Sequence, residues 1–132
     1  MHPTIFTLFA LSLAALEVYA KLQNVTVKGV TMCDGKRVAN VHVMLLEKDA
    51  LDADDNLASA HTNEEGEFEL FGEDDEIGSI EPLIRIHHTC DAKPGCERIS
   101  EYLVPEDKIG GFYDMTYVTL DIKTAEDKIK CQ

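Results

Sequence analysis

The stretch Val25-Thr26-Val27-Lys28-Gly29-Val30-Thr31-Met32 decides the fold class of this chain. Its apolar and polar side chains largely alternate, and a period of two residues is typical of a β-strand that buries one face. Cys33-Asp34-Gly35 follows, and an Asp-Gly pair favours a tight turn. The sequence therefore predicts a strand over residues 25–32 that ends in a turn.

The same alternation recurs along the rest of the chain. It predicts further strands over residues 41–47, 57–62, 67–71, 82–88, 98–104 and 115–122, and a short one around 108–113. Turn and loop signals separate these segments about every 8–12 residues, and no segment shows the apolar stripe of a long helix. We expect loops over residues 49–56, 73–79 and 105–111, and a polar tail with at most one helical turn over 123–132. Seven or eight short strands predict an all-β fold, an antiparallel β-sandwich.

Residues 1–20 have the pattern of a secretory signal peptide. Residues 5–16 carry no charge, and Val18-Tyr19-Ala20 fits a small-x-small cleavage site. The uncharged run is too short to span the ~30 Å of hydrocarbon in a bilayer. Only His2 precedes the run, without Lys or Arg, so a buried N-terminal strand or helix is the alternative. We expect a secreted, extracellular protein with one domain over residues 21–132.

Acidic side chains outnumber basic ones. The chain has 25 Asp and Glu against 12 Lys and Arg, a formal net charge of −13. Such a surface repels nucleic acids and anionic lipid headgroups, and no segment beyond residue 20 is long and apolar enough to cross a membrane. We therefore expect no nucleic-acid partner and no stable membrane insertion.

Four cysteines follow the proposed leader: Cys33, Cys90, Cys96 and Cys131. An even number of cysteines in a small secreted domain predicts two disulfide bonds. A zinc site would instead favour paired short spacings such as C-x2-C, which are absent. The spacing alone leaves three pairings open.

Six segments resemble the nematode transthyretin-like proteins. In order, they are residues 27–33, 41–47, 52–57, 62–70, 80–82 and 87–90. The resemblance extends from about residue 24 to residue 120. One difference is visible after Cys33, where the family commonly has a proline and this chain has Lys36-Arg37. That difference concerns only the shape of the turn.

The resemblance implies a sandwich of two sheets, stapled by disulfides, with strand orders C-B-E-F and D-A-G-H. The letters A to H stand for the strands expected at 25–32, 41–47, 57–62, 67–71, 82–88, 98–104, 108–113 and 115–122, in that order. It also implies a non-enzymatic extracellular binding protein without a cofactor. We expect it to act through protein contacts at a cell surface or in extracellular fluid, where a parasitic worm's protein would meet host tissue.

Two more distant relatives give alternative functions. Transthyretin carries thyroid hormone between its subunits, which would imply a carrier of a small apolar ligand or lipid. The hydroxyisourate hydrolases share the fold and use a C-terminal Tyr-Arg-Gly-Ser, whereas this sequence ends in Lys130-Cys131-Gln132. None of Ser59, Ser79 and Ser100 lies in a Gly-x-Ser-x-Gly motif. We therefore expect no enzyme.

The implied topology places Cys33, Cys90 and Cys96 at one pole of the sandwich. It favours the pairings Cys33–Cys90 and Cys96–Cys131, the second because the tail could run back along the edge strand at 98–104. The alternative is a Cys90–Cys96 bridge that closes a hairpin and leaves Cys33 with Cys131.

Histidines collect at the same pole. Alternation places His42 and His87 on the outward face of neighbouring strands, with His61 at the end of a third and His88 facing inward. Such histidines are candidates for a zinc or copper site, or for a pH-sensitive patch. The alternative is a set of solvated or hydrogen-bonded side chains, because Arg85 is near and the spacing places no carboxylate beside them. We expect no resident metal ion.

Carboxylates collect at the opposite pole. The loop at 49–56 offers Asp52, Asp54 and Asp55 as candidate calcium ligands, since calcium binds several oxygens. The spacing does not match an EF-hand. The alternative is a solvated acidic end that steers a basic protein partner.

Asn24-Val25-Thr26 is an N-glycosylation sequon at the start of the first strand. In a secreted chain it makes Asn24 a candidate glycan site.

Overall fold

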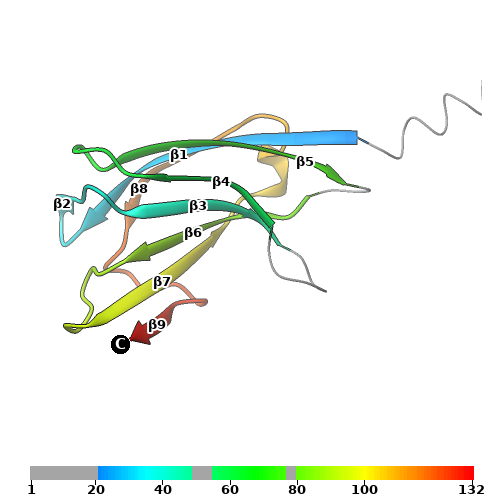
Figure 1. Ribbon diagram of the computed structural model, residues 1–132. Coiled ribbons are helices and arrows are strands. Elements are labelled where there is room, and N and C mark those ends of the chain that lie inside the picture. Colours follow the sequence, from blue (N-terminus) through cyan, green and yellow to red (C-terminus); the bar gives the residue numbers. More distant parts are fainter. Residues whose placement is uncertain (1–20, 49–54, 77–79) are drawn as a thin grey trace, which may run out of the picture.

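Two β-sheets pack against each other in the computed structural model, which describes residues 21–48, 55–76 and 80–132 (Figure 1). The first sheet contains β1 (Lys21–Cys33), β2 (Lys36–Arg37), β5 (Glu67–Glu76) and β8 (Phe112–Thr119). The second has the order β4-β3-β6-β7-β9, with bounds β3 (His42–Glu47), β4 (Asp55–His61), β6 (Pro82–His88), β7 (Cys96–Leu103) and β9 (Lys128–Cys131). The predicted all-β sandwich is confirmed.

The core lies between the two sheets. Alternate residues of each strand point inward, so Val25 and Val27 of β1 face Val43 and Leu45 of β3, within one buried cluster. Further members come from the other central strands: Phe68, Leu70, Ile84, Ile86, Val118 and Leu120. Full burial of one such side chain stabilises the fold by roughly 1.5–3 kcal/mol.

Helical structure is minor. Within the described residues it is limited to a 3-10 turn at Glu106–Lys108. No helix in this part of the chain has the length and apolar character needed to cross a bilayer.

The segment 73–76, predicted as loop, is strand. β5 continues to Glu76, and its end pairs antiparallel with Lys21 at the start of β1, which begins four residues earlier than predicted. At Gly72 the strand also passes close to the second sheet, because a Cβ there would come within 2.7 Å of Leu45 Cδ2 and 2.9 Å of Leu57 Cβ. The backbone ladder therefore outweighs the acidic composition of the segment.

The C-terminal third differs most from the prediction. The two strands expected at 108–113 and 115–122 are one strand, β8, which pairs parallel with β1. The register shifts between Lys28 and Val30, and Thr116 has a positive φ of 57° at this irregularity. The other strand pairs of the described residues are antiparallel. The fully antiparallel arrangement and the separate strands G and H were wrong.

The tail is also more ordered than predicted. Residues 128–131 form β9, which pairs antiparallel with β7 and places Cys131 opposite Cys96. Its ladder and its disulfide supply the stabilisation that its polar composition lacks. The tail runs back along the edge strand towards Cys96, as the family resemblance implied, but it does so as a strand and not as a helical turn.

Candidate functional site at the disulfide pole

Two disulfide bonds lie at one end of the sandwich, which we call the disulfide pole. Cys33 at the end of β1 is bonded to Cys90 beyond β6, which joins the two sheets. Cys96 at the start of β7 is bonded to Cys131 in β9, within the second sheet. These are the pairings favoured from the resemblance, and no cysteine is free.

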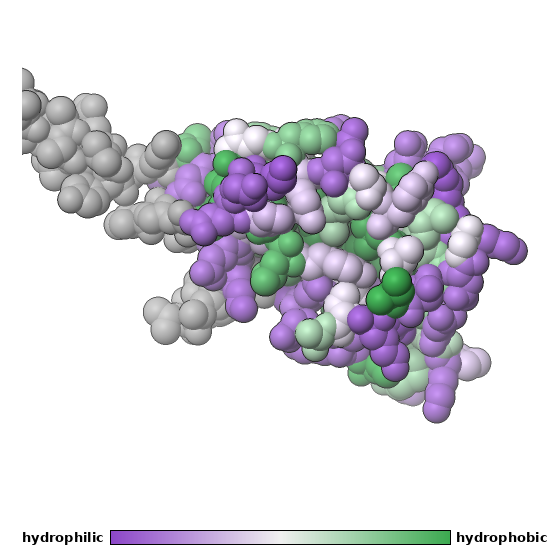
Figure 2. Space-filling view, turned by 180° about the vertical axis from the view of Figure 1, so that it is seen from behind, coloured by the Kyte–Doolittle hydropathy of each residue, from purple (hydrophilic) through white to green (hydrophobic). Residues whose placement is uncertain are grey.

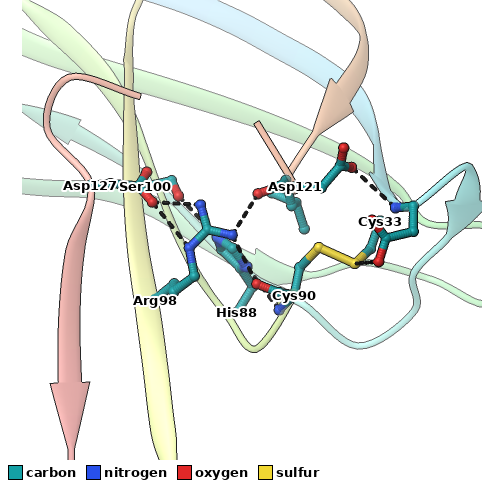
Figure 3. The surroundings of a disulfide bond; sticks show 9 residues. Cys33, His88, Cys90, Arg98, Ser100, Asp121 and Asp127 are labelled. Carbon is teal, nitrogen blue, oxygen red and sulfur yellow. Dashed lines mark hydrogen bonds and ion pairs between the residues drawn. A yellow bond between two sulfur atoms is a disulfide. The ribbon is translucent and has the colours of Figure 1, made fainter. Parts of the chain in front are cut away.

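A buried arginine fastens four chain segments beside the first disulfide (Figure 3). Arg98, on β7, is 2% exposed and forms an ion pair with Asp127 of the C-terminal segment. Its NH1 group donates hydrogen bonds to the carbonyl oxygens of Cys90 (2.8 Å) and Leu120 (2.9 Å). Because a buried guanidinium needs its donors satisfied, this single side chain holds β7, the turn after β6, the end of β8 and the tail together.

His88 lies in the same cluster as a neutral hydrogen-bonding link. The backbone N–H of Cys90 donates to His88 Nδ1 (3.1 Å), so the ring proton is on Nε2, which lies 2.9 Å from Ser100 Oγ and donates to it. Burial, and then the positive charge of Arg98, lower the pKa of His88 to about 4. The imidazole is therefore uncharged at neutral pH.

Asp127 closes the cluster as a carboxylate. Burial raises its pKa, but hydrogen bonds from Arg98, Ser100 and Thr124 outweigh that effect and hold the pKa at about 2. The hydrogen bonds therefore form a closed loop. On one side His88 and Ser100 link the Cys90 N–H to Asp127, and on the other side Arg98 links Asp127 to the Cys90 carbonyl. We call these residues the buried cluster.

The grouping of Ser100, His88 and Asp127 differs from a nucleophilic triad. In a triad the histidine accepts the serine proton at Nε2 and donates from Nδ1 to the aspartate. Here Nδ1 is occupied by a backbone N–H, and Ser100 is fully buried. The arrangement stabilises the pole and gives no reactive hydroxyl.

The outer face of the second sheet carries a row of three imidazoles at the same pole. His42 on β3 lies directly opposite His61 on β4 and His87 on β6. The ring centroids of His42 and His61 are 4.8 Å apart with nearly parallel planes, and those of His42 and His87 are 5.6 Å apart. The outward neighbours expected from alternation are adjacent, and His61 extends them to three. We call them the histidine row.

The histidine row also has a carboxylate beside it, Glu97, which the spacing of residues in the sequence did not reveal. Glu97 Oε1 lies 2.9 Å from His87 Nδ1. The strand containing Glu97 was predicted to begin at residue 98, but β7 begins at Cys96. Alternation along the true strand would have put Glu97 on the outer face. Arg85, which seemed to oppose a cation, is paired with Glu101.

A hollow of about 660 Å³ opens beside the histidine row. Its lining includes the disulfide Cys33–Cys90, the three histidines of the row and Glu97. Burial, and then the charges of His61 and His87, lower the pKa of His42. His42 therefore binds a proton less readily than a free imidazole, and all three rings of the histidine row border the hollow.

A second exposed surface lies on the outer face of the first sheet. Phe71 of β5 and Phe112 of β8 flank Thr26 of β1, and Tyr117 lies beside Val30. Phe71, Phe112 and Tyr117 are 56%, 46% and 60% exposed. We call these three residues the aromatic face. Charged side chains lie between them, and the Nζ atom of Lys28 is 5.0 Å from the centre of the Phe112 ring.

The remaining candidate residues are scattered. Asp55 is exposed at the start of β4, whereas Asp52 and Asp54 lie outside the described residues, so the calcium site stays a prediction. Asn24 lies in β1, half-buried, and its carbonyl accepts a hydrogen bond from the Gly110 N–H (2.6 Å). Its glycosylation stays a prediction, as does the signal peptide, since residues 1–20 also lie outside the described part.

Potential metal ligands converge in one group of the described residues: Cys33, Asp34, Cys90 and Asp91. The two sulfurs are bonded to each other, so they offer no thiolate, and the group reduces to two exposed carboxylates. A hydrogen bond with Asp91, and to a lesser extent the negative charges of Asp91 and Asp121, raise the pKa of Asp34.

The two packed sheets and the two disulfide bonds at one end define a disulfide-bonded β-sandwich. The chain belongs to the transthyretin-like family, whose model matches residues 28–105. It is 60% identical to transthyretin-like protein 16 of Caenorhabditis elegans over 123 residues, which cover 92% of this chain and 93% of that protein. Transthyretin-like proteins 2 and 5 of the same nematode are each 35% identical, over 72% and 77% of this chain.

Among solved structures, a 9R-lipoxygenase from Cyanothece is similar with a TM-score of 0.51 and 16% identity. The match covers 85% of this chain and 20% of the lipoxygenase chain. At this identity the likeness shows the sandwich fold alone.

Proposed function

We propose that this chain is a secreted, non-catalytic binding protein that acts through contacts with another protein, in extracellular fluid or at a cell surface. The signal-peptide pattern of residues 1–20 and the two disulfides support an oxidising, extracellular location. Membership in the transthyretin-like family supports a scaffold built to present surfaces.

The aromatic face is the observation that carries this proposal. The strands that carry the aromatic face, β5 and β8, are both hydrogen-bonded to β1. Their backbone therefore holds Phe71, Phe112 and Tyr117 rigidly, while each side chain remains about half exposed. Aromatic side chains on rigid elements lose little entropy on binding and are enriched at the centres of protein interfaces. Hydrophobic and hydrophilic side chains are interspersed on the side of the molecule that Figure 2 shows.

Charge supports a basic partner. The net charge is −13, and Glu67 and Glu69 of β5 lie opposite Val30 and Lys28, on the same side of the sheet as Phe71. Acidic side chains around an apolar contact steer a basic surface towards it and raise the association rate. We therefore propose a protein partner with a basic, partly apolar surface.

Carriage of an apolar ligand is the alternative. The hollow of about 660 Å³ is lined largely by histidine and acidic side chains. A second hollow, of about 580 Å³, mixes charged side chains with Val30, Phe68 and Tyr117. Both are open to solvent, and neither is an enclosed apolar cavity. A carrier that resembles transthyretin would therefore need an apolar cleft between subunits.

Capture from extracellular fluid tests the proposal. The secreted protein is immobilised, and bound proteins are quantified by mass spectrometry for wild type, Phe112→Ser and Tyr117→Ser. Leu103→Ser, at an exposed apolar position on β7 in the other sheet, is the control. We expect one set of partners that is lost in the first two variants and kept in the control.

Native mass spectrometry distinguishes the proposed binding protein from a carrier of an apolar ligand. We expect a protein without bound ligand whose variants have the same mass distribution. An oligomer that carries additional ligand mass, with no protein captured through the aromatic face, would overturn the proposal in favour of a carrier.

A further inference from the structure

We propose that the histidine row and Glu97 form a binding site for one divalent transition-metal ion that prefers imidazole ligands, copper(II) or zinc. This site is independent of the aromatic face and of the proposed protein partner.

The first argument is the position of the three imidazoles. His61, His42 and His87 occupy directly opposed positions on three neighbouring strands. Opposed residues of antiparallel strands have Cβ atoms about 4.5–5.5 Å apart. Three rings with that spacing can lean towards a common point above the middle strand, so the sheet itself places three nitrogen ligands within reach of one ion.

The second argument is the carboxylate on His87. Histidines that ligate metals usually donate their other ring N–H to a carboxylate or a carbonyl, which fixes the tautomer and raises the basicity of the ligating nitrogen. Glu97 Oε1 accepts from His87 Nδ1 at 2.9 Å. Nε2 of His87 is left for the metal, and Glu97 supplies one negative charge near the ion.

The charged side chains around the histidine row do not repel a cation strongly. Arg85, two residues before His87 on the same face, is paired with Glu101. On β9, Lys130 lies opposite Glu97 and is exposed, while Asp34 and Asp91 line the same hollow on its other side. With a net charge of −13 on the chain, the overall field attracts cations.

Binding requires the rings to turn. Those of His42 and His61 are nearly parallel, at 10°, so their nitrogens do not converge on one point as they stand. Both side chains border the open hollow of about 660 Å³, which gives their side-chain torsions the space to rotate. We therefore expect a site that forms on metal addition, with affinity for copper(II) above that for zinc, as in the general order of stability for nitrogen ligands.

Titration of the untagged secreted protein with copper(II) and with zinc, against a competing chelator at neutral pH, tests the proposal. We expect one ion per chain, at least about tenfold weaker binding in each of His42→Gln, His61→Gln and His87→Gln, and about tenfold weaker binding in Glu97→Gln. Glu69→Gln, the same change of charge at an exposed position of β5 in the other sheet, should bind like wild type. Circular dichroism checks that each variant is folded.

The copper(II) paramagnetic resonance spectrum gives a second readout, which should show nitrogen couplings from imidazoles that are reduced in each histidine variant. Copper bound equally well by the three histidine variants would place it elsewhere and overturn the proposal. Loss of binding in a single histidine variant, with the other two like wild type, would reduce the site to one surface histidine and would also overturn it.

Discussion

His87 and His88 are neighbours in sequence, yet they belong to opposite regions of the molecule. His87 lies on the outer face of β6, in the histidine row, where it faces an open hollow. His88 lies in the buried cluster, where both ring nitrogens are used in hydrogen bonds and its pKa is about 4. A step of one residue along a strand therefore separates an imidazole that can bind a ligand from one that holds the fold together.

The comparison implies that the buried cluster and the histidine row have different roles. The buried cluster links four chain segments, so its loss should unfold the pole. The histidine row has few stabilising contacts, so changes there should alter binding and leave the fold intact. The following changes test that difference, from the largest expected effect to the smallest.

Arg98→Met should lower the free energy of unfolding by about 3–5 kcal/mol, because it leaves the Asp127 carboxylate buried without its partner and removes donors from two carbonyls. Urea denaturation of the oxidised protein measures the change. Arg85→Met on the outer face is the control: its ion pair with Glu101 is about a quarter exposed, and its loss should cost about 1 kcal/mol or less. Equal effects would contradict the difference in roles.

The disulfides come next. Replacing Cys33 and Cys90 together by Ser, or Cys96 and Cys131 together, should each lower the free energy of unfolding by roughly 2–4 kcal/mol, since each bridge restricts the unfolded chain. The first pair should cost more, because it closes 57 residues rather than 35 and Cys90 packs beside the buried cluster. Denaturation midpoints of the two double variants give the order, and the reverse order would count against a central role for the cluster.

Acid should destabilise the buried cluster through His88. Its pKa is lowered from 6.5 to about 4 in the folded protein, so the unfolded chain binds a proton more readily between these values. The free energy of unfolding should therefore be constant above pH 6.5 and fall by at most about 3 kcal/mol towards pH 4. Asp127, with a pKa of about 2 against 3.8 unfolded, adds a further loss only as the pH falls from 3.8 to 2.

The check is the free energy of unfolding at several pH values in wild type and in His88→Gln. The variant should lose most of the slope between pH 6.5 and 4. A slope that persists unchanged would assign the acid sensitivity to other groups.

The smallest effect is expected in the histidine row. His61→Gln removes an exposed side chain at the end of β4, so the free energy of unfolding at pH 7 should change by no more than about 0.5 kcal/mol. The same denaturation experiment without metal ions measures it. A loss comparable to that of Arg98→Met would show that the row, too, supports the fold.

The strands and the facing of their side chains could be predicted because alternation is a local signal. Residues 82–88 and 41–47 show it clearly, and it separates His42 and His87 from His88 without any knowledge of tertiary structure. The cysteine pairing followed from the family resemblance, since spacing alone left three choices.

The buried cluster could not be predicted, because its contacts span long separations. Arg98 and Asp127 are 29 residues apart, and Asp127 lies in a segment with no apolar pattern. Likewise, β9 is exposed at every position, so nothing local indicates a strand until its pairing with β7 and the bond to Cys96 are known. Glu97 was missed because the predicted strand began one residue after it.

The attachment of β9 to β7 has a consequence for how the protein behaves in crowded fluids. Without it, the full length of β7 would be an open edge with free backbone donors and acceptors, which is the kind of surface on which identical molecules add to one another as fibres. The cover is short and carries Lys128 and Lys130, and short, charged outer strands recruit further strands poorly. Reduction of the Cys96–Cys131 disulfide would remove the covalent attachment of β9 to β7. How long the protein stays monomeric therefore depends on how oxidising its surroundings are.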